Sequence, residues 1–413
     1  MPFEYIDRQL CVTHKGGVIP LKDVVTRSPD PIYVYDLDGV MDRLEKFKGS
    51  LSVPHSVHFA LKANNNRLIL SAMAQAGFGV DVVSGGELQL AIDCGFSPER
   101  IVFSGVGKTV SEIEKAIQLR IKQINVESPQ ELKRIIALAK KIGRSARVAF
   151  RMNPDVHAET HPYITTGFRE NKFGMDRTFL PELESQVREA EGAVTLVGLT
   201  VHIGSQLKQL EPMIEAIEKT KEIHNELQSR GWDLKTFDVG GGLGIHYEDG
   251  NLAVDEKAIA QYGSAVSEAT REMGVEILFE PGRVIVARFG VLIGEVQYIK
   301  ETPYKNFAIL NTGMHHIMRP CLYQAHHRLL PLTQKTVAPQ LYDIVGPICE
   351  SSDVLGKDRA LPILEQGDFI AVADAGAYGA VMANAYNSHS LPKEFVVYNG
   401  VCQATPSKVP VSF

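Results

Sequence analysis

Lys62 is the side chain in this sequence best suited to covalent chemistry. It follows an apolar stretch in the segment HFALKANNN. A lysine at the end of a buried strand is seldom left without a partner. Burial lowers the pKa of its amine, and an unprotonated amine is what a Schiff base with a carbonyl compound requires. The alternative is a structural lysine that pairs with Asp81 or Glu127.

Three consecutive glycines, Gly240, Gly241 and Gly242, follow the strand-like segment TFDV. Backbone N–H groups that no side chain covers can bind a phosphate, although a tight turn explains the glycines equally well. A dinucleotide fingerprint is excluded, because the third glycine of GxGxxG would fall on Ile245. The segment GVGKT (105–109) is not a P-loop either, because the first glycine of that motif would fall on Val102.

Two further positions end apolar stretches. Glu280 precedes Pro-Gly-Arg and could hold a ring nitrogen protonated, or could form an ion pair with Arg283. His202 lies near Ser205, and its role is either in binding or as a satisfied core histidine. Both positions are therefore candidates for a cofactor site.

Cys349 and Glu350 are adjacent in the second half of the chain. A cysteine beside a carboxylate tends to stay protonated, which suits a proton donor better than a nucleophile, but a small buried hydrophobe is the ordinary alternative. The histidine pairs at 315–316 and 326–327 lack carboxylates at ligand spacing, and the sequence has no HExxH. We therefore predict exposed histidines there and no metal site.

The elements that must position these groups alternate between short apolar runs and helical patterns. Eight such units in the stretch 58–282 predict a (β/α)8 barrel, whereas a doubly wound open sheet usually has fewer strands. In a barrel the C-terminal strand ends, where the polar residues cluster, form the active-site mouth. The strands are expected at 58–63, 79–84, 101–105, 124–128, 147–153, 196–204, 236–242 and 276–282.

After Gly282 the pattern changes to strand-like runs separated by Gly and Pro, beginning with VIVARFGVLIGEVQYIKE. The segment CVTHKGGVIPL near the N-terminus has the same character. We predict a barrel domain over residues 35–282 and a β-rich domain formed by residues 1–34 with 283–413.

Composition narrows the class of protein. The chain has 413 residues, 44% of them hydrophobic, and a net charge of −6 without a basic run, which argues against nucleic acid as a partner. It lacks a signal peptide pattern and a long apolar run, which argues against a membrane protein. Five scattered cysteines without a CxxC favour neither a disulfide framework nor a zinc site, and they fit a reducing cytoplasm.

The order of eleven segments along the chain resembles the fold-type III pyridoxal phosphate (PLP)-dependent decarboxylases, the class-II family of Orn/Lys/Arg decarboxylases. The resemblance implies PLP as cofactor and an alanine-racemase-like (β/α)8 barrel with a C-terminal β-barrel or β-sandwich domain. The segments are HFALKANNN, GVDVVSGGEL, FSGVGKT, RMNPDV, HPYITTGFRENKFGM, VHIGSQ, DVGGGLGIHY, FEPGR, MRPCLYQAHH, GPICESSD and DAGAYGAVMANAYNS.

For the cofactor, the resemblance implies that Lys62 forms the Schiff base, that His202 stacks on the ring and that Glu280 partners the pyridine nitrogen. It further implies that the phosphate is held by Ser205, Gly241 and Gly242. The remaining residues implied to line the cofactor are Pro281, Gly282, Arg283 and Tyr378.

For the substrate, the resemblance implies that an amino acid's distal carboxylate is held by Arg283, Arg319 and Tyr323. Glu350 is placed near the distal amine. The resemblance also implies a homodimer with shared active sites, to which a second copy of the chain supplies Cys349 as proton donor and Tyr378.

Within the family, the RPxLY and CESSD context is similar to members that convert meso-2,6-diaminopimelate to L-lysine and CO2, the last step of lysine biosynthesis. Decarboxylases of ornithine, arginine or carboxynorspermidine and biosynthetic-cluster homologues are the nearest alternatives. A racemase would need a tyrosine base opposite the lysine, and a non-catalytic PLP-binding protein would not need the set Lys62, Glu280 and Cys349. The sequence departs from the family pattern at Thr200, LNTGMHHIMRP and YNSHS.

Overall fold

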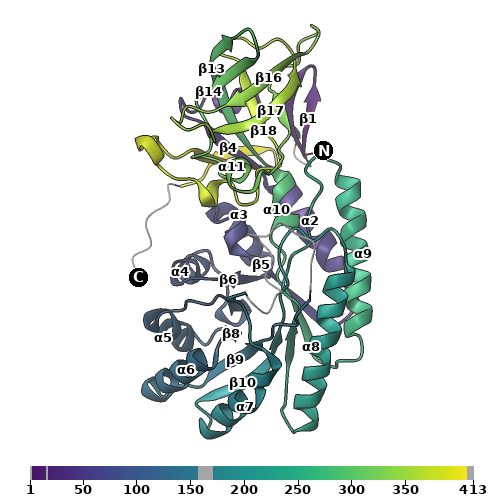
Figure 1. Ribbon diagram of the computed structural model, residues 1–413, viewed down its shortest axis with the longest axis vertical. Helices are drawn as coiled ribbons and strands as arrows, with labels where there is room; N and C mark the ends of the chain where they lie inside the picture. Colours follow the sequence, from purple (N-terminus) through teal and green to yellow (C-terminus); the bar gives the residue numbers. More distant parts are fainter. Residues whose placement is uncertain (1, 15–16, 157–170, 407–413) are drawn as a thin grey trace. The chain divides into compact units, whose positions relative to one another are not determined.

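The computed structural model describes residues 2–14, 17–156 and 171–406, and in this part the chain forms two compact units (Figure 1). The barrel unit contains Glu45–Gly244 and Lys257–Gly282. The second unit contains the described parts of Met1–Leu44 and Arg283–Lys408, together with Ile245–Glu256. Within the described residues, no helix has the length and apolar character needed to span a membrane.

The predicted fold class is confirmed, because eight parallel strands close into a barrel in the order β10-β11-β12-β5-β6-β7-β8-β9. All eight predicted strands are present, but the predictions run past their C-terminal ends. Lys62, for example, lies in the 3-10 turn Leu61–Ala63 that follows β5. The strands are β5 (His55–Ala60), β6 (Gly79–Val82), β7 (Ile101–Phe103), β8 (Gln123–Val126), β9 (Ala146–Arg151), β10 (Val194–Thr200), β11 (Thr236–Asp238) and β12 (Glu276–Phe279).

Helices alternate with these strands and flank the barrel in Figure 1. In α6, Ser128 Oγ accepts the N–H of Glu131 at 3.1 Å, and the helix ends where Gly143 takes φ 72. The helices that follow the strands are α3 (Arg67–Gln75), α4 (Gly85–Asp93), α5 (Val110–Leu119), α6 (Pro129–Ile142), α7 (Leu180–Glu189), α8 (Glu211–Ser229) and α9 (Leu252–Thr270); α2 (Leu37–Gly49) precedes β5.

The second unit is β-rich, as predicted, and contains a nine-stranded mixed sheet and a three-stranded sheet. Its core packs apolar residues of both sheets, including Leu10, Val34 and Ile293. The strands are β1 (Phe3–Ile6), β2 (Gln9–His14), β3 (Gly17–Pro20), β4 (Ile32–Asp36), β13 (Gly290–Glu301), β14 (Asn306–Leu310), β15 (Leu329–Pro331), β16 (Gln340–Val345), β17 (Val354–Leu361), β18 (Phe369–Val372), β19 (Lys393–Tyr398) and β20 (Val401–Ala404); the short helices are α1 (Leu21–Val25), α10 (Arg283–Val286) and α11 (Arg319–Tyr323).

One strand prediction is wrong in its first part. The β-branched run after Arg283 predicts a strand, but Arg283–Val286 form α10 and Ala287–Phe289 form a 3-10 turn. All seven residues are buried, so tertiary packing overrides the β propensity of Val284, Ile285 and Val286. The strand β13 begins only at Gly290.

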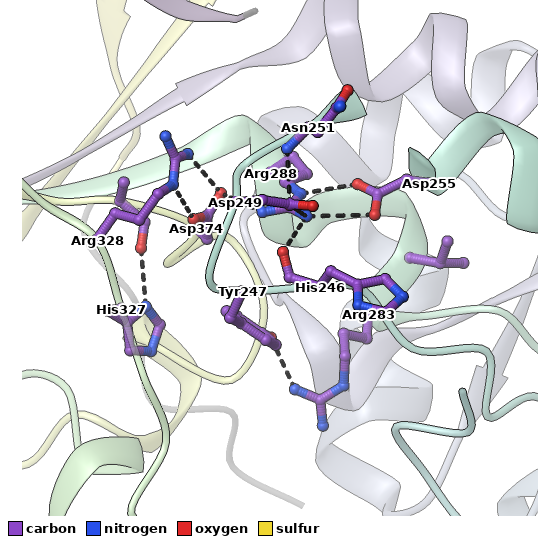
Figure 2. Close-up of polar contacts among 12 residues, drawn as sticks. His246, Tyr247, Asp249, Asn251, Asp255, Arg283, Arg288, His327, Arg328 and Asp374 are labelled. Carbon is purple, nitrogen blue, oxygen red and sulfur yellow. Dashed lines mark hydrogen bonds and ion pairs between the residues drawn. The ribbon is translucent and has the colours of Figure 1, made fainter. Parts of the chain in front are cut away.

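A buried ionic cluster holds Ile245–Glu256 within the second unit (Figure 2). Arg288 Nε donates to Asp255 Oδ2 at 2.7 Å, and Arg288 Nη1 lies 3.2 Å from Asp374 Oδ1. Arg43 Nη1 lies 3.8 Å from the same oxygen of Asp255. Asp255 therefore neutralises two guanidinium groups that are removed from water.

An Asp255→Ala variant is expected to lose about 3 kcal/mol of unfolding free energy, because it leaves Arg43 and Arg288 buried beside too little negative charge. Urea unfolding of the variant and of the intact chain measures the loss. The control is Asp233→Ala, which removes an exposed partner of Lys235 and should change the free energy by less than about 0.5 kcal/mol. Equal stabilities of the two variants would contradict the role given to Asp255.

Candidate active site

The amine of Lys62 is paired but still reaches solvent. Its Nζ donates to Asp81 Oδ2 at 3.2 Å, while 36% of the Lys62 side chain is exposed and that of Asp81 is fully buried. The other oxygen of Asp81 has no hydrogen-bond partner among the described residues. The ion pair considered from the sequence is therefore present, and it presents the amine at the barrel mouth without enclosing it.

Two buried carboxyl groups, Glu280 and Asp238, share a hydrogen bond at the ends of β12 and β11. Burial raises the pKa of Asp238 to about 6. Burial, followed by the charges of Asp238 and Asp81, raises the pKa of Glu280 well above its usual value. The hydrogen bond between the two carboxyl groups needs a proton, and their burial favours its retention, so the pair has a proton that a basic ring nitrogen could share.

The imidazole of His202 is neutral. Burial, and then the positive charges of Arg151 and Lys62, hold its pKa well below the usual value. The N–H of Gly241 donates to His202 Nδ1 at 3.3 Å. An uncharged ring in this position is suited to stacking on a planar ligand.

The glycines at the end of β11 leave bare backbone where no side chain could fit. A Cβ on Gly241 would lie 2.1 Å from the carbonyl oxygen of Glu280. A Cβ on Gly242 would lie 2.5 Å from the carbonyl oxygen of Gly204, and the φ of 118 at Gly242 also requires glycine. Ser205 follows Gly204 and is half-buried.

Together these barrel residues fit PLP, the cofactor that the resemblance implies. PLP needs an accessible amine, a carboxyl group for its ring nitrogen and backbone donors for its phosphate. The barrel unit provides Lys62, Glu280 and the glycine cradle for these roles. The unpartnered oxygen of Asp81 is a further buried acceptor beside Lys62.

Lys108 of the segment GVGKT has a structural role in the barrel. Its Nζ donates to the carbonyl oxygens of Gly105 and Asn125, each at 2.7 Å, and to Glu131 Oε1 at 2.8 Å. The side chain is only 1% exposed. Lys108 therefore ties the loop after β7 to β8 and to the first turn of α6, and all three of its donors are used.

In the second unit, two buried arginines lie among aromatic rings. Arg319 is 4.3 Å from the ring centroid of Tyr247, and its Nη1 donates to His327 Nε2 at 2.7 Å. Arg283 Nη1 donates to the hydroxyl of Tyr247 at 2.8 Å (Figure 2). Burial and then the charge of Arg283 lower the pKa of Arg319, so this pair of cations favours an anionic ligand.

Tyr378 lies against Arg283 of its own chain, with the guanidinium 4.7 Å from the ring centroid. Its φ of 55 is in the left-handed region, as is the φ of 56 at Asp374. Such backbone strain persists where the surrounding contacts fix it, often at functional sites. Tyr378 thus contacts Arg283 of its own chain, and its role across a dimer interface stays a prediction.

Cys349 and Glu350 are both exposed in the second unit. Glu350 accepts the hydroxyl of Tyr386 at 2.5 Å and that of Ser352 at 3.1 Å. Tyr323, the last residue of α11, is half-buried. Within a single chain, Cys349 and Glu350 thus lie on the surface, where a second molecule could contact them.

The sequence analysis did not identify several residues of these clusters. Asp238 and Tyr247 lie in the segment DVGGGLGIHY, and a buried aspartate beside the glycines was the available signal. Glu127, considered above as a partner of Lys62, pairs instead with Arg151 at 2.5 Å. The prediction of exposed histidines is wrong, because His327 and both residues of the pair at 315–316 are buried. Most of the segment HPYITTGFRENKFGM (161–175) lies outside the described residues.

Glu87 provides a test of the electrostatics near Lys62. Burial raises the pKa of Glu87 to about 7 although its Oε2 accepts the N–H of Val83 at 2.8 Å. The folded chain therefore binds this proton more tightly than the unfolded chain, whose value is near 4.5. The stability associated with Glu87 is fully present below that lower value and is lost as the pH rises through about 7.

When the pH is raised from 5 to 8, the unfolding free energy of a Glu87→Gln variant is accordingly expected to fall less than that of the intact chain. The amide oxygen of glutamine can still accept the N–H of Val83, so the fold should be retained. Urea unfolding at both pH values gives the comparison. An unchanged pH dependence would contradict the raised pKa of Glu87.

Comparisons with known proteins agree with these features. Residues 37–287 match the family described as pyridoxal-dependent decarboxylase, pyridoxal binding domain. The diaminopimelate decarboxylase of Vibrio cholerae serotype O1 is 42% identical over 383 residues, which cover 92% of this chain and 90% of that protein. The crystal structure of diaminopimelate decarboxylase from Helicobacter pylori complexed with L-lysine is 40% identical, with a TM-score of 0.87 and coverage of 93% of this chain and 95% of that chain.

A more distant structural match is a decarboxylase of arginine, one of the alternative substrates considered above. The arginine decarboxylase of Paramecium bursaria Chlorella virus covers 91% of this chain and 99% of its own, with a TM-score of 0.81 and 22% identity. Similarity at that level of identity shows a shared fold alone.

Proposed function

Because the chain belongs to the diaminopimelate decarboxylases, a family of PLP-dependent decarboxylases, we propose that it converts meso-2,6-diaminopimelate to L-lysine and CO2, the last step of lysine biosynthesis. The observation that best supports this substrate is the buried pair of Arg283 and Arg319. The guanidinium of Arg319 contacts the uncharged side chains of Tyr247 and His327. A second carboxylate on the substrate would supply a negative charge beside these two cations.

The barrel residues hold and orient the cofactor. When bound, PLP supplies an electron sink for the electron pair that CO2 leaves behind. Lys62 would hold it covalently through Nζ, His202 would pack against the ring, and Glu280 would hold a proton at the ring nitrogen. Ser205, Gly241 and Gly242 bind the phosphate, and the backbone of Pro281 and Gly282 lines the cofactor.

Residues of the second unit bind the distal groups of the substrate and supply the proton that replaces CO2. Arg283, Arg319 and Tyr323 bind the distal carboxylate, and Tyr378 packs beside them. Glu350 binds the distal amine, which is positively charged at neutral pH. Cys349 donates the Sγ proton to the carbon that has lost CO2.

A panel of amino acids tests this function. CO2 release should be fastest from meso-diaminopimelate, with a kcat/KM at least about 100-fold above those for ornithine and arginine, because a buried arginine left unpaired disfavours substrates without a distal carboxylate. Carboxynorspermidine completes the panel. Preferred turnover of any of the other three would overturn the proposed substrate.

We propose further that the enzyme is a cytoplasmic homodimer in which Cys349 serves the partner's site. The exposure of the Cys349 side chain in one chain supports the dimer, and five cysteines that are all free support a reducing compartment. Mixing a Lys62→Ala chain with a Cys349→Ala chain should restore up to about a quarter of the wild-type activity, because half of the dimers then contain one intact site. No recovery after subunit exchange would contradict shared sites.

A further inference from the structure

A chain of buried polar side chains runs through the barrel interior and ends at the carboxyl group of Glu280. Its members come from four neighbouring or facing strands, β7, β8, β11 and β12, or from the residue just after them. None is more than 7% exposed. They are Thr236, Gln123, Asn125, Asp238, Ser104 and Glu280.

The hydrogen bonds of this chain lead from Thr236 to the carboxyl pair. Thr236 Oγ1 donates to Gln123 Oε1 at 2.8 Å, and the carbonyl oxygen of Val197 is a second, longer acceptor for the same hydroxyl at 3.3 Å. Gln123 Nε2 then donates to Asn125 Oδ1 at 2.8 Å. The side-chain oxygen of Asn125, Oδ1, thereby has a donor, and the side-chain NH2 group points toward the carboxyl pair.

Asn125 uses both protons of that NH2 group. Nδ2 donates to Ser104 Oγ at 3.0 Å and to Asp238 Oδ2 at 3.3 Å. Ser104 has one proton and directs it to Glu280 Oε1 at 3.4 Å. The remaining oxygen of Asp238, Oδ1, accepts the N–H of Gly240 at 2.9 Å.

Both oxygens of Asp238 therefore accept N–H donors, which stabilises the ionised form of this carboxyl group. The hydrogen bond that joins Asp238 to Glu280 needs one proton, and the N–H groups on Asp238 favour Glu280 as its donor. The charges that face the pair agree with this assignment. Asp81 and Asp238 raise the pKa of Glu280, and Lys62 lowers it.

We propose that Asn125 is a positioning residue that keeps Asp238 ionised and so keeps the shared proton of the carboxyl pair on Glu280. The placement of the proton is a property of the chain itself. Its consequence for catalysis rests on the proposed function, because Glu280 enters the reaction already carrying the proton that a ring nitrogen requires.

Isotope-edited infrared spectroscopy of the full-length, cofactor-free protein locates this proton. Samples are labelled with 13C on the side-chain carboxyl of either glutamate or aspartate, and the Glu280→Gln spectrum is subtracted from that of the wild type. Measurement at pH 8 removes the contribution of Glu87, whose pKa is about 7. The protonated carboxyl band should shift in the glutamate-labelled sample alone, and a shift in the aspartate-labelled sample would overturn the proposal.

Replacement of Asn125 tests whether this residue keeps the proton on Glu280. In Asn125→Ala the aspartate-labelled sample should acquire the shift, and the PLP-loaded enzyme should lose roughly 10- to 100-fold in kcat with little change in KM. Asn125→Leu, which keeps a similar shape without the NH2 donor and adds no carboxyl group, provides the same test if the alanine variant does not fold. Thr220→Val, which removes a buried hydroxyl bonded to Ala216 in α8, should leave both measurements unchanged.

The outcomes separate this proposal from the proposed function. If Asn125→Ala retains the glutamate shift and the wild-type kcat, the role of Asn125 is wrong. If the wild type shows the glutamate shift but releases no CO2 from meso-diaminopimelate, the proposed function fails and the placement of the proton stands.

Discussion

Replacement of Lys62 by alanine is expected to lower the rate of CO2 release by on the order of 1,000-fold or more, because the variant has no amine to bind the cofactor or to exchange with the substrate. The absorbance band of the bound cofactor should be lost at the same time. Steady-state decarboxylation and the absorption spectrum of the PLP-incubated protein measure the two effects.

Two matched variants separate chemistry from charge. Lys62→Arg retains a cation that can pair with Asp81 but cannot bind PLP covalently, so it should be as inactive as the alanine variant. Lys133→Ala removes an exposed lysine that pairs with Glu182 and should retain the wild-type rate. Full activity of Lys62→Arg would refute the covalent role and leave only an electrostatic one.

Replacement of Arg319 by methionine is expected to reduce kcat/KM for meso-diaminopimelate by roughly 100- to 1,000-fold, because a buried charged hydrogen bond to the substrate is lost. The slower rate expected with ornithine, which lacks the second carboxylate, should change much less. The ratio of the two kcat/KM values therefore falls, and this ratio is the quantity to measure.

The matched control for Arg319→Met is Arg27→Met, at an exposed arginine of the second unit that donates to the carbonyl oxygen of Cys402. This control should leave the ratio unchanged. An equal fall in both rates for Arg319→Met would show that the arginine supports the fold rather than the distal carboxylate.

The barrel could be predicted from the sequence because each strand is a short apolar run that precedes a helical pattern. The strand ends were less predictable. Lys62 continues an apolar run in the sequence, but the chain leaves the sheet at Ala60 and turns, which places the lysine at the mouth. The helix that begins at Arg283 was also missed, because complete burial removes the alternation that distinguishes strands from helices.

The candidate site could be predicted where the residue type itself indicates a chemical role, as for Lys62 and Glu280. No such signal exists for Asp238, Asn125 and Gln123. Their roles depend on the neighbours that lie within hydrogen-bond distance once the barrel has closed. Tyr247 and His327 were missed for the same reason. Both contact Arg319, but Tyr247 lies far before Arg319 in the sequence and His327 follows it. Sequence spacing therefore could not indicate that the three residues meet.

The most direct measurement of the central claim is the product of a single reaction. Purified protein with PLP and meso-diaminopimelate should yield L-lysine and CO2 in equal amounts, as determined by chiral amino-acid analysis and CO2 trapping. Absence of lysine, or lysine formed without an equal amount of CO2, would contradict the assignment of this chain as a diaminopimelate decarboxylase.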